Sequence, residues 1–346
     1  MNISANFKEY ILKFKFPAKT SKNILIEKKT WFLFLKSDNN IGIGECSFVN
    51  HLSRKNEQQI NQKLKEICNK INNNIELQEI LNNLNDYPGI KFAIETAIID
   101  LKTKGNKILF PSEFTEGKKG IKINGLIWID NKDNVIKQIE KKLDEKYSCI
   151  KLKIGSMNLD EELEILSKIR KISFDVEIRL DANGAFNYTN ALDIINYLKK
   201  FNIHSIEQPI PPGNFEAMQY LCKKSPIPIA LDEELIFSTC NKQWLLDTIK
   251  PHYLVLKPGL LGGFNNTLEW IKLANERKIN WWVTSALESN IGLNAISQWT
   301  FTLKNQLTQG LGTGQLYSNN ISSPLFLKGE FLYFDQQQKW DLSNII

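Results

Sequence analysis

The sequence has few of the residues that bind zinc or form disulfide frameworks. Its three histidines are isolated from one another, so a histidine-based zinc site is not expected. Its five cysteines are odd in number and have neither paired nor metal-type spacing. We interpret them as buried thiols of a protein in the reducing cytoplasm.

Long apolar runs and long basic runs are also absent from the sequence. No stretch approaches the roughly 20 apolar residues that cross a bilayer. Residues 1–16 alternate apolar and polar positions, which is typical of a strand and not of a signal peptide. The net charge is +6, but the lysines are scattered among glutamates and asparagines. We therefore expect neither a membrane nor a nucleic acid as a partner.

The length of the chain, and the pattern of apolar and polar residues in its first third, predict a small α+β domain followed by a larger domain. The chain has 346 residues, of which 42% are hydrophobic and 24% charged, as in a globular protein with a large core. The first part shows three alternating strands followed by helical spacing, at residues 6–17, 31–35, 41–45, 56–71 and 90–105. A Pro- and Gly-containing stretch at 110–120 predicts the crossing into the next domain.

From residue 121 onward, short apolar strands alternate with amphipathic helices. Eight such strands follow one another, with their ends about 25–30 residues apart, the length of one βα unit. The prediction is an α/β fold, a (β/α) barrel with an N-terminal α+β capping domain. The expected bounds are 1–118 for the capping domain, 119–315 for the barrel, and 316–346 for a C-terminal tail that returns to the capping domain.

Ionisable residues stand at the ends of five consecutive predicted barrel strands. Active sites of barrel enzymes gather at the C-terminal ends of the strands. Packing alone rarely places charges there, because burying an unpaired charge costs several kcal/mol. From the second to the sixth strand, the residues are Lys151 and Lys153, Asp181, Glu207, Asp232 and Lys257.

Three of these residues are carboxylates that predict a site for a hard cation. Asp181, Glu207 and Asp232 follow neighbouring strands, and oxygen ligands of this kind suit Mg²⁺, with Mn²⁺ as a substitute. Each carboxylate taken alone could equally cap a turn, as the Asn-Gly after Asp181 would suggest. Three in succession at the barrel period favour the metal site.

The lysines predict a base in the same place. Lys151 and Lys153 are two residues apart and point to one side of a strand, while Lys257 approaches from across the barrel. A neighbouring ammonium and a divalent cation would both lower the pKa of a lysine enough for it to act as a base. Lysines on an exposed edge strand are the alternative, but the intervening apolar residues indicate a buried strand.

These motifs together resemble the enolase superfamily, in the branch that contains muconate-lactonising enzymes, dipeptide epimerases and o-succinylbenzoate synthases. The motifs are KLK at 151–153, RLDANGAF at 179–186, EQP at 207–209, DEE at 232–234 and LKPGLLGG at 256–263. The segments LFPSEFTEG, INGLIW, GIGECSF, TSALESNIGLNAISQWT and GLGTGQLY look most like the o-succinylbenzoate synthases. Lysine bases with Mg²⁺ at an ene-diolate are the known pattern of the superfamily.

The resemblance implies a role for each charged residue. Lys153 would be the base, Lys257 the opposing cation, and Lys151 would tune Lys153. Asp181, Glu207 and Asp232 would hold Mg²⁺. The substrate would be a small-molecule carboxylate, 2-succinyl-6-hydroxy-2,4-cyclohexadiene-1-carboxylate, dehydrated to o-succinylbenzoate for menaquinone biosynthesis.

Further candidates surround this centre. Ser285 and Ser289, and the Gly262-Gly263 pair, are expected to contact the succinyl group through backbone N–H groups near a helix start, although helix caps and a tight turn explain them equally well. Arg179 is expected to contact substrate or to support the first metal ligand, and Asn183 to support that ligand. Residues 19–23 and 48–54 are expected to act as lids.

Two alternatives stay open. The first is an N-acylamino acid or dipeptide racemase or epimerase on the same scaffold, with Lys153 and Lys257 as two bases. Dipeptide epimerases of the branch carry an Asp-x-Asp for the substrate ammonium where this chain has Gly312-Thr313-Gly314, although an N-succinyl amino acid would not need it. The second is an inactive barrel that serves as a binding protein. The sequence leaves the oligomeric state open.

Overall fold

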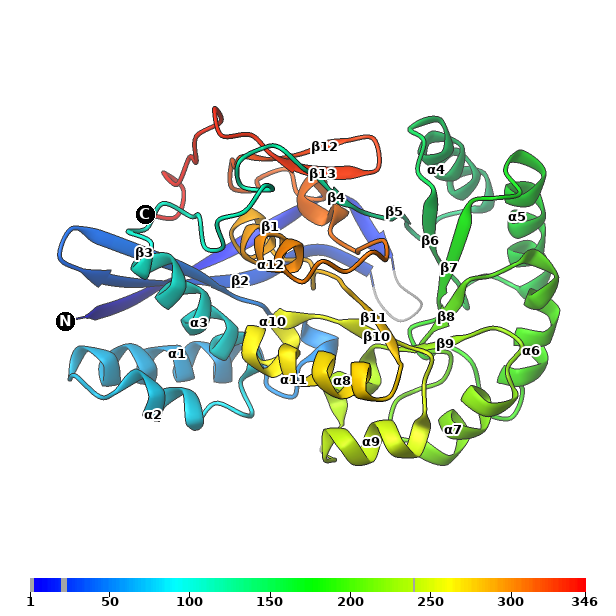
Figure 1. Cartoon of the computed structure of the whole chain (residues 1–346), viewed down its shortest axis with the longest axis horizontal. Helices are drawn as coiled ribbons and strands as arrows, with labels where there is room; N and C mark the ends of the chain where they lie inside the picture. The colour runs from blue at the N-terminus through cyan, green and yellow to red at the C-terminus, as the bar shows by residue number, and fades with distance from the viewer. Residues whose placement is uncertain (1–2, 20–23, 239) are drawn as a thin grey trace.

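The computed structural model describes residues 3–19, 24–238 and 240–346. Figure 1 shows a barrel formed by the green-to-orange part of the chain, with the blue N-terminal strands and helices against one side of it. The predicted lid at 19–23 lies, apart from its first residue, outside the described residues. In the described part of the chain, no helix combines the length and apolar character needed to cross a bilayer.

The barrel is built on a seven-stranded parallel sheet whose strands follow one another in chain order. Its strands are β5 (Gly125–Ile127), β6 (Cys149–Lys153), β7 (Glu177–Asp181), β8 (Ser205–Glu207), β9 (Ile229–Leu231), β10 (Tyr253–Leu256) and β11 (Asn280–Val283). The eighth predicted strand is reduced to a short bridging segment. There Gln309 pairs with Ile123, and Gly310 pairs with Thr284, both in parallel. This segment joins the two edges of the sheet and closes the barrel, as the sequence predicts.

Helices follow the strands and cover the outside of the sheet. They are α4 (Lys132–Asp144), α5 (Leu159–Ile172), α6 (Ala191–Leu198), α7 (Phe215–Lys224), α8 (Glu233–Phe237), α9 (Lys242–Ile249), α10 (Pro258–Leu261), α11 (Gly263–Glu276) and α12 (Asn290–Thr302). Several begin at an asparagine whose side chain accepts a backbone N–H, for example Asn131 before α4 and Asn158 before α5. The abundance of asparagine in this chain therefore has a local structural use.

The N-terminal part forms an antiparallel meander covered by helices, as the sequence predicts. It comprises β1 (Ser4–Lys19), β2 (Ile24–Ser37), β3 (Asn40–Cys46), the 3₁₀ turn η1 (Asn50–Leu52), α1 (Glu57–Asn72), α2 (Leu77–Asn82) and α3 (Pro88–Lys102). Helix α3 approaches β3 so closely that a Cβ at Gly44 would overlap the carbonyl of Ala93. Glycine is required there because only a bare backbone permits this contact.

The C-terminal segment contacts both parts of the molecule. The hairpin of β12 (Leu325–Lys328) and β13 (Phe331–Phe334) pairs with β4 (Ile121–Lys122) at the start of the barrel. Ile321 and Ile345 then pack with Phe32 of the meander. The expected domain bounds at 118 and 315 stay predictions.

The five cysteines are free, and four of them are buried, while Cys240 is partly exposed. Burial raises the pKa of the Cys68 thiol to about 11 and that of Cys222 to about 12. These two thiols are therefore inert at neutral pH.

Candidate active site

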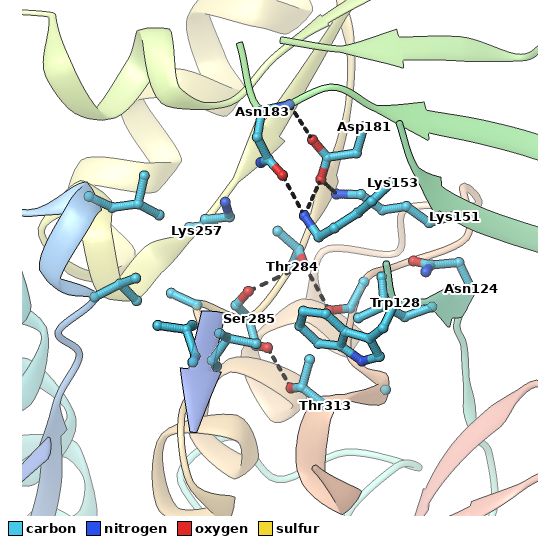
Figure 2. A pocket seen from close by; sticks show the side chains of 18 of the residues that line it. Asn124, Trp128, Lys151, Lys153, Asp181, Asn183, Lys257, Thr284, Ser285 and Thr313 are labelled. Carbon is cyan, nitrogen blue, oxygen red and sulfur yellow. Dashed lines mark hydrogen bonds and ion pairs between the residues drawn. The ribbon is translucent and has the colours of Figure 1, made fainter. Parts of the chain in front are cut away.

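A pocket lies at the C-terminal ends of the barrel strands, beneath the N-terminal meander. Its barrel side carries Lys151, Lys153, Asp181, Asn183 and Lys257. Its other side is closed mainly by apolar and aromatic side chains. Leu25 comes from the meander, Val49, His51 and Leu52 come from the loop that follows the meander, and Trp128 comes from a barrel loop. Figure 2 shows Lys151 and Lys153 beside Asp181, with Lys257 entering from a separate side.

The parallel register of the strands brings the predicted ionisable residues into one layer. Lys153 on β6 pairs with Asp181 on β7, and Asp181 pairs with Glu207 on β8. Asp232 and Lys257 directly follow β9 and β10. Because neighbouring parallel strands end at the same rim, residues far apart in sequence meet there.

The lysines and the buried carboxylates form two neighbouring sets of ion pairs. The Lys151 ammonium lies 2.6 and 2.7 Å from the two carboxylate oxygens of Glu207 and 3.0 Å from Asp181 Oδ2. Lys153 Nζ lies 3.0 Å from the same Asp181 oxygen. Lys257 forms an ion pair with Asp232 Oδ2. The structure thus brings together all six residues that the sequence singles out.

Burial and mutual charge shift the pKa values of this network in opposite directions. Burial alone would raise the pKa of Asp181, but the ammonium groups of Lys151 and Lys153 lower it well below its usual range. Burial, reinforced by the charge of Asp181, raises the pKa of Glu207 to about 8. Burial likewise raises the pKa of Asp232 to about 6. The charges of the three lysines are therefore not enough to keep Glu207 and Asp232 fully ionised beside Asp181, and a further positive charge at the site would favour their ionised forms.

Lys151 and Lys257 are held in their charged forms. Burial opposes the charge on Lys151, but Asp181 and Glu207 outweigh it and raise the pKa of the ammonium. Burial also opposes the charge on Lys257, where Asp232 and Glu233 raise the pKa. The expected lowering of a lysine pKa by a neighbouring ammonium is therefore not seen for Lys151, because Asp181 and Glu207 raise its pKa.

The carboxylate oxygens of Asp181, Glu207 and Asp232 are ligands that suit a hard divalent cation, but in this structure they form ion pairs with the lysines. Among the described residues, no group of three or more acidic, histidine or cysteine side chains is spaced to hold a metal ion. The reason is that the ammonium groups of Lys151 and Lys257 contact the facing oxygens of Glu207 and Asp232. Asp232 Oδ1 is buried without a hydrogen-bond partner among the described residues, as an oxygen reserved for a cation would be.

Asn183 lies where the sequence predicts and links a lysine to a residue that the sequence reasoning missed. Its side-chain oxygen accepts a hydrogen bond from Lys153 Nζ at 2.7 Å, and its amide donates to Glu233 Oε1 at 2.9 Å. Glu233 is 5% exposed, and burial raises its pKa. Its position inside the DEE motif was the signal that could have identified it.

Gln208 is a second residue whose role was missed. It adopts a left-handed backbone conformation at φ 40° and is fully buried. Its side-chain oxygen accepts the backbone N–H groups of Asp232 and Glu234, at 3.2 and 3.1 Å. Gln208 therefore fixes the chain that carries Asp232, and its place after Glu207 in the EQP motif was the available signal.

The end of the pocket away from the lysines is neutral and polar. Ser285 lines it, and its hydroxyl lies 2.5 Å from Thr313 Oγ1; its contact with the succinyl group stays a prediction. Asn124 also lines the pocket and is 5% exposed. Figure 2 shows its amide turned toward the lysines. Asn124 lies in the INGLIW segment just before β5, but it was not among the expected site residues, because it carries no charge.

The structure argues against substrate contact for the other expected residues. Ser289 is fully buried, and its hydroxyl donates to Glu45 Oε2 at 2.6 Å. It also accepts Ile291 N–H as the cap of α12. The correction has a physical reason: the hydroxyl is already bonded on both sides and faces the meander.

The Gly262-Gly263 pair is corrected for a similar reason. The N–H groups of Phe264 and Asn265, at the start of the helix that follows, are both taken by the carboxylate of Glu95. A carboxylate of the chain itself thus occupies this helix start, and neither Gly262 nor Gly263 lines the pocket.

Arg179 lies one layer deeper in the barrel than Asp181. It is 1% exposed, donates to Glu177 and to the carbonyl of Thr308, and stacks on Trp282. Because it points to the same side as Asp181 but lies two residues earlier on the strand, it sits beneath the site and does not line the pocket.

The comparisons with known proteins agree with this geometry. Residues 134–335 match the family described as Enolase C-terminal domain-like. An o-succinylbenzoate synthase from Desulfotalea psychrophila is 43% identical, over 92% of this chain and 95% of that protein. The chain belongs to the o-succinylbenzoate synthase family of the enolase superfamily.

Structural similarity extends along the chain. The crystal structure of MenC from Desulfotalea psychrophila superposes with a TM-score of 0.85 at 39% identity, covering 96% of this chain and 100% of that one. An L-Ala-D/L-Glu epimerase from Thermotoga maritima is 25% identical, over 75% of this chain and 72% of that protein. The synthase relative is thus closer in sequence than this epimerase.

The segment that distinguishes synthases from dipeptide epimerases forms part of the pocket wall. Gly312 and Thr313 line the pocket from the 3₁₀ turn η3 (Gly312–Gln315). They follow the segment that closes the barrel, and they carry no carboxylate. A substrate ammonium group would therefore find no acidic partner in this part of the wall.

Proposed function

We infer that this protein catalyses the o-succinylbenzoate synthase reaction, a lyase reaction that removes water from 2-succinyl-6-hydroxy-2,4-cyclohexadiene-1-carboxylate. The observation that carries the inference is the pair of lysines on β6 and after β10, facing one carboxylate cluster from different sides of a pocket without an acidic amine anchor. The 43% identity to a synthase supports it.

The carboxylates of Asp181, Glu207 and Asp232 would hold Mg²⁺, with Mn²⁺ as a substitute, because they offer hard oxygens from three adjacent strands. When bound, the cation supplies stabilisation of negative charge at the substrate carboxylate. One buried oxygen of Asp232, Oδ1, has no hydrogen-bond partner among the described residues and is therefore available to a cation. Glu233 and Asn183 would support the ligands from behind.

Lys153 would carry the proton. As a neutral amine it takes the proton from the carbon next to the ring carboxylate, and the C–H electron pair moves into the ring. The ring hydroxyl then leaves with the proton returned from the Lys153 ammonium, so that one water is lost and the aromatic ring forms without any redox step. Asn183 Oδ1 and Asp181 Oδ2 hold Nζ in position, at 2.7 and 3.0 Å.

Lys257 would act as a fixed positive charge on the opposite side of the substrate. Its ammonium stays charged because Asp232 and Glu233 raise its pKa. A preorganised cation stabilises an anionic intermediate without needing to reorient. Lys151 would hold Asp181 and Glu207 in place, and Ser285 would contact the succinyl group at the neutral end of the pocket.

The second candidate is an N-acylamino acid or dipeptide racemase or epimerase. The same two lysines could remove and return a proton on opposite faces of an α-carbon. The neutral turn at Gly312 and Thr313 disfavours a substrate with a free ammonium group, but an N-succinyl amino acid would avoid that problem. Dipeptides are therefore expected to react poorly or not at all.

The deciding experiment is incubation of the purified protein with the cyclohexadiene substrate and Mg²⁺, while the ultraviolet absorbance of the aromatic product is followed. Parallel reactions contain N-succinyl amino acids or dipeptides in deuterated water, with isotope exchange read by NMR. Dehydration with kcat/KM above about 10⁴ M⁻¹s⁻¹ supports the inference. Efficient dipeptide epimerisation without dehydration would overturn it.

A further inference from the structure

Two buried carboxylates join the N-terminal meander to the barrel close to the pocket, and the proposed reaction uses neither. Glu45 lies on β3, and Glu288 lies just before α12. Both are 0% exposed. Burying a carboxylate is costly unless hydrogen bonds compensate, so their partners indicate what they hold together.

Glu45 fixes the start of α12. Its oxygens accept the backbone N–H of Ser289 at 2.9 Å, the hydroxyl of Ser289 at 2.6 Å and the N–H of Gly292 at 2.9 Å. They also accept the hydroxyl of Thr30 at 3.0 Å. A strand of the meander is thereby attached to the helix that follows the seventh barrel strand.

Glu288 joins three segments at one point. Its Oε1 accepts the hydroxyl of Ser47, in the loop that continues to the pocket-lining residues Val49 and Leu52. Its Oε2 accepts the N–H of Ala286 at 2.6 Å, within the loop that forms the pocket wall. The first bond crosses from the meander to the barrel, and the second closes a turn of the barrel loop itself.

The third segment is the turn that carries Lys257. A Cβ on Gly259 would overlap both Ser47 Oγ and Glu288 Oε1, so the hydrogen-bonded pair lies directly against this glycine. The carbonyl of Lys257 accepts the N–H groups of Leu260 and Leu261, both at 2.9 Å, so backbone hydrogen bonds close the turn next to Gly259. A displacement of the Glu288 carboxylate would therefore be transmitted to Lys257.

The pocket wall is also held in an unfavourable conformation at this point. Leu287, between Ala286 and Glu288, has a left-handed φ of 61°. A branched side chain adopts this conformation only where its surroundings impose it. The bond from Ala286 N–H to Glu288 closes the turn, and Tyr317 Oη donates to the carbonyl of Leu287 at 2.7 Å.

We propose that Glu288 is a positioning residue for the dehydration. The Glu288 junction, made of Ser47, Gly259, Ala286 and Glu288, sets the Lys257 turn and the pocket wall against the meander. The proposal rests on the proposed function. Burial, with the charge of Glu45 adding to it, raises the pKa of Glu288, and the buried Lys28 opposes the shift. We explain the presence of a carboxylate at this buried position by the hydrogen bonds with which it joins Ser47 of the meander to the barrel loop at Ala286.

The test compares variants that keep or remove the hydrogen bonds at constant size. Glu288→Gln retains an acceptor for Ala286 N–H and an amide for Ser47, so it should retain most of the activity. Glu288→Leu removes both bonds and should lower kcat by about 10²-fold, the usual cost of a small misplacement of a catalytic group. Ser47→Ala removes one bond and should show a smaller loss in the same direction.

The matched control is Ser148→Ala. Ser148 Oγ donates to Glu330 at 2.5 Å, a serine–glutamate bond at the opposite end of the barrel strands. Its loss should leave kcat unchanged. The apparent Mg²⁺ dissociation constant, measured by titration, should be the same in all folded variants, because Glu288 contacts none of the proposed ligands. A purely structural role would lower the melting temperature without lowering kcat at temperatures where the protein is folded.

The outcomes separate the two inferences. A wild-type protein without dehydratase activity refutes the proposed function, whatever the variants do. An active wild type whose Ser47→Ala and folded Glu288→Leu variants keep normal kcat and KM refutes the positioning role alone. If Glu288→Leu does not fold, Ser47→Ala decides. A kcat loss accompanied by an equal loss of Mg²⁺ affinity also refutes the role, because the effect would then pass through the metal site.

Discussion

Asp181 Oδ2 lies 3.0 Å from the ammonium groups of both Lys151 and Lys153, so one oxygen atom sets the positions of two lysines. The two lysines nevertheless differ in their other partners. Lys151 is held by the paired oxygens of Glu207, whereas Lys153 is held by the neutral amide of Asn183. Lys151 is the poorer candidate for a base, because Asp181 and Glu207 raise its pKa and stabilise its protonated form.

The first prediction concerns the division of labour between the lysines. Lys153→Ala should abolish proton removal, because Lys151 is held in its charged form by Asp181 and Glu207 and Lys257 faces the substrate from a separate side as a fixed charge. Lys257→Ala should lose roughly 10²-fold or more in rate, because the anionic intermediate loses a preorganised charge. The measurement is dehydration of a substrate deuterated beside the carboxylate. Near-normal turnover with a primary isotope effect in Lys153→Ala, together with an inactive Lys257→Ala, would show that the roles are reversed.

The second prediction concerns Glu207. Glu207→Gln replaces an anion with a neutral amide, so Lys151 loses the negative charge of the carboxylate that lies 2.6 Å away. Activity at saturating substrate should fall by at least about 10²-fold. Circular dichroism should show an unchanged fold. Glu145→Gln, which removes a charge at the end of α4, is the control and should retain full activity. An active Glu207→Gln would exclude this residue as a ligand.

At the scale of single elements, the helix starts are specified locally by asparagine. Asn158 accepts the N–H of Glu161 at 2.9 Å and caps α5, but Asn190 stands at the same position before α6 and makes no such bond. The sequence alone does not distinguish the two, because the side-chain rotamer depends on how the preceding loop enters the helix.

The third prediction uses this pair. Asn158→Ala should lower the free energy of unfolding by about 1 kcal/mol, since one N–H of the first turn loses its acceptor. Asn190→Ala removes the same side chain without removing a cap and should change stability by less than half as much. Urea denaturation followed by circular dichroism measures both. Equal losses in the two variants would contradict the role assigned to the cap of α5.

At the scale of the whole molecule, we expect the binding of a divalent cation at the buried carboxylates to stabilise the folded state. The cluster of Asp181, Glu207, Asp232 and Glu233 is buried, and burial raises the pKa values of the last three. A divalent cation that binds the folded chain and not the unfolded chain stabilises the folded state by mass action.

The fourth prediction follows from this linkage. Removal of divalent ions with a chelator should abolish activity, and Mg²⁺ or Mn²⁺ should restore it. The melting temperature should rise with Mg²⁺ concentration in the wild type and rise much less in Glu207→Gln. Full activity in excess chelator, or a melting temperature that is independent of Mg²⁺, would refute the metal assignment.

The sequence by itself determined the barrel, the N-terminal meander and the layer of charged residues at the strand ends. The period of the βα units and the position of each charge at a strand end are local properties, and parallel strands necessarily bring their ends together. Lys153, Asp181 and Glu207 therefore met in the register that their strands dictate. The motifs that pointed to the family are local in the same sense.

Only the tertiary structure decided which polar groups around this layer are available. Ser289 and the N–H groups after Gly263 looked free in sequence, but Glu45 and Glu95 from distant segments bind them. Asn124, in contrast, lines the pocket although it carries no charge that would have singled it out in sequence. The physical reason is that a hydrogen bond depends on which groups folding brings within about 3 Å, whatever their separation along the chain.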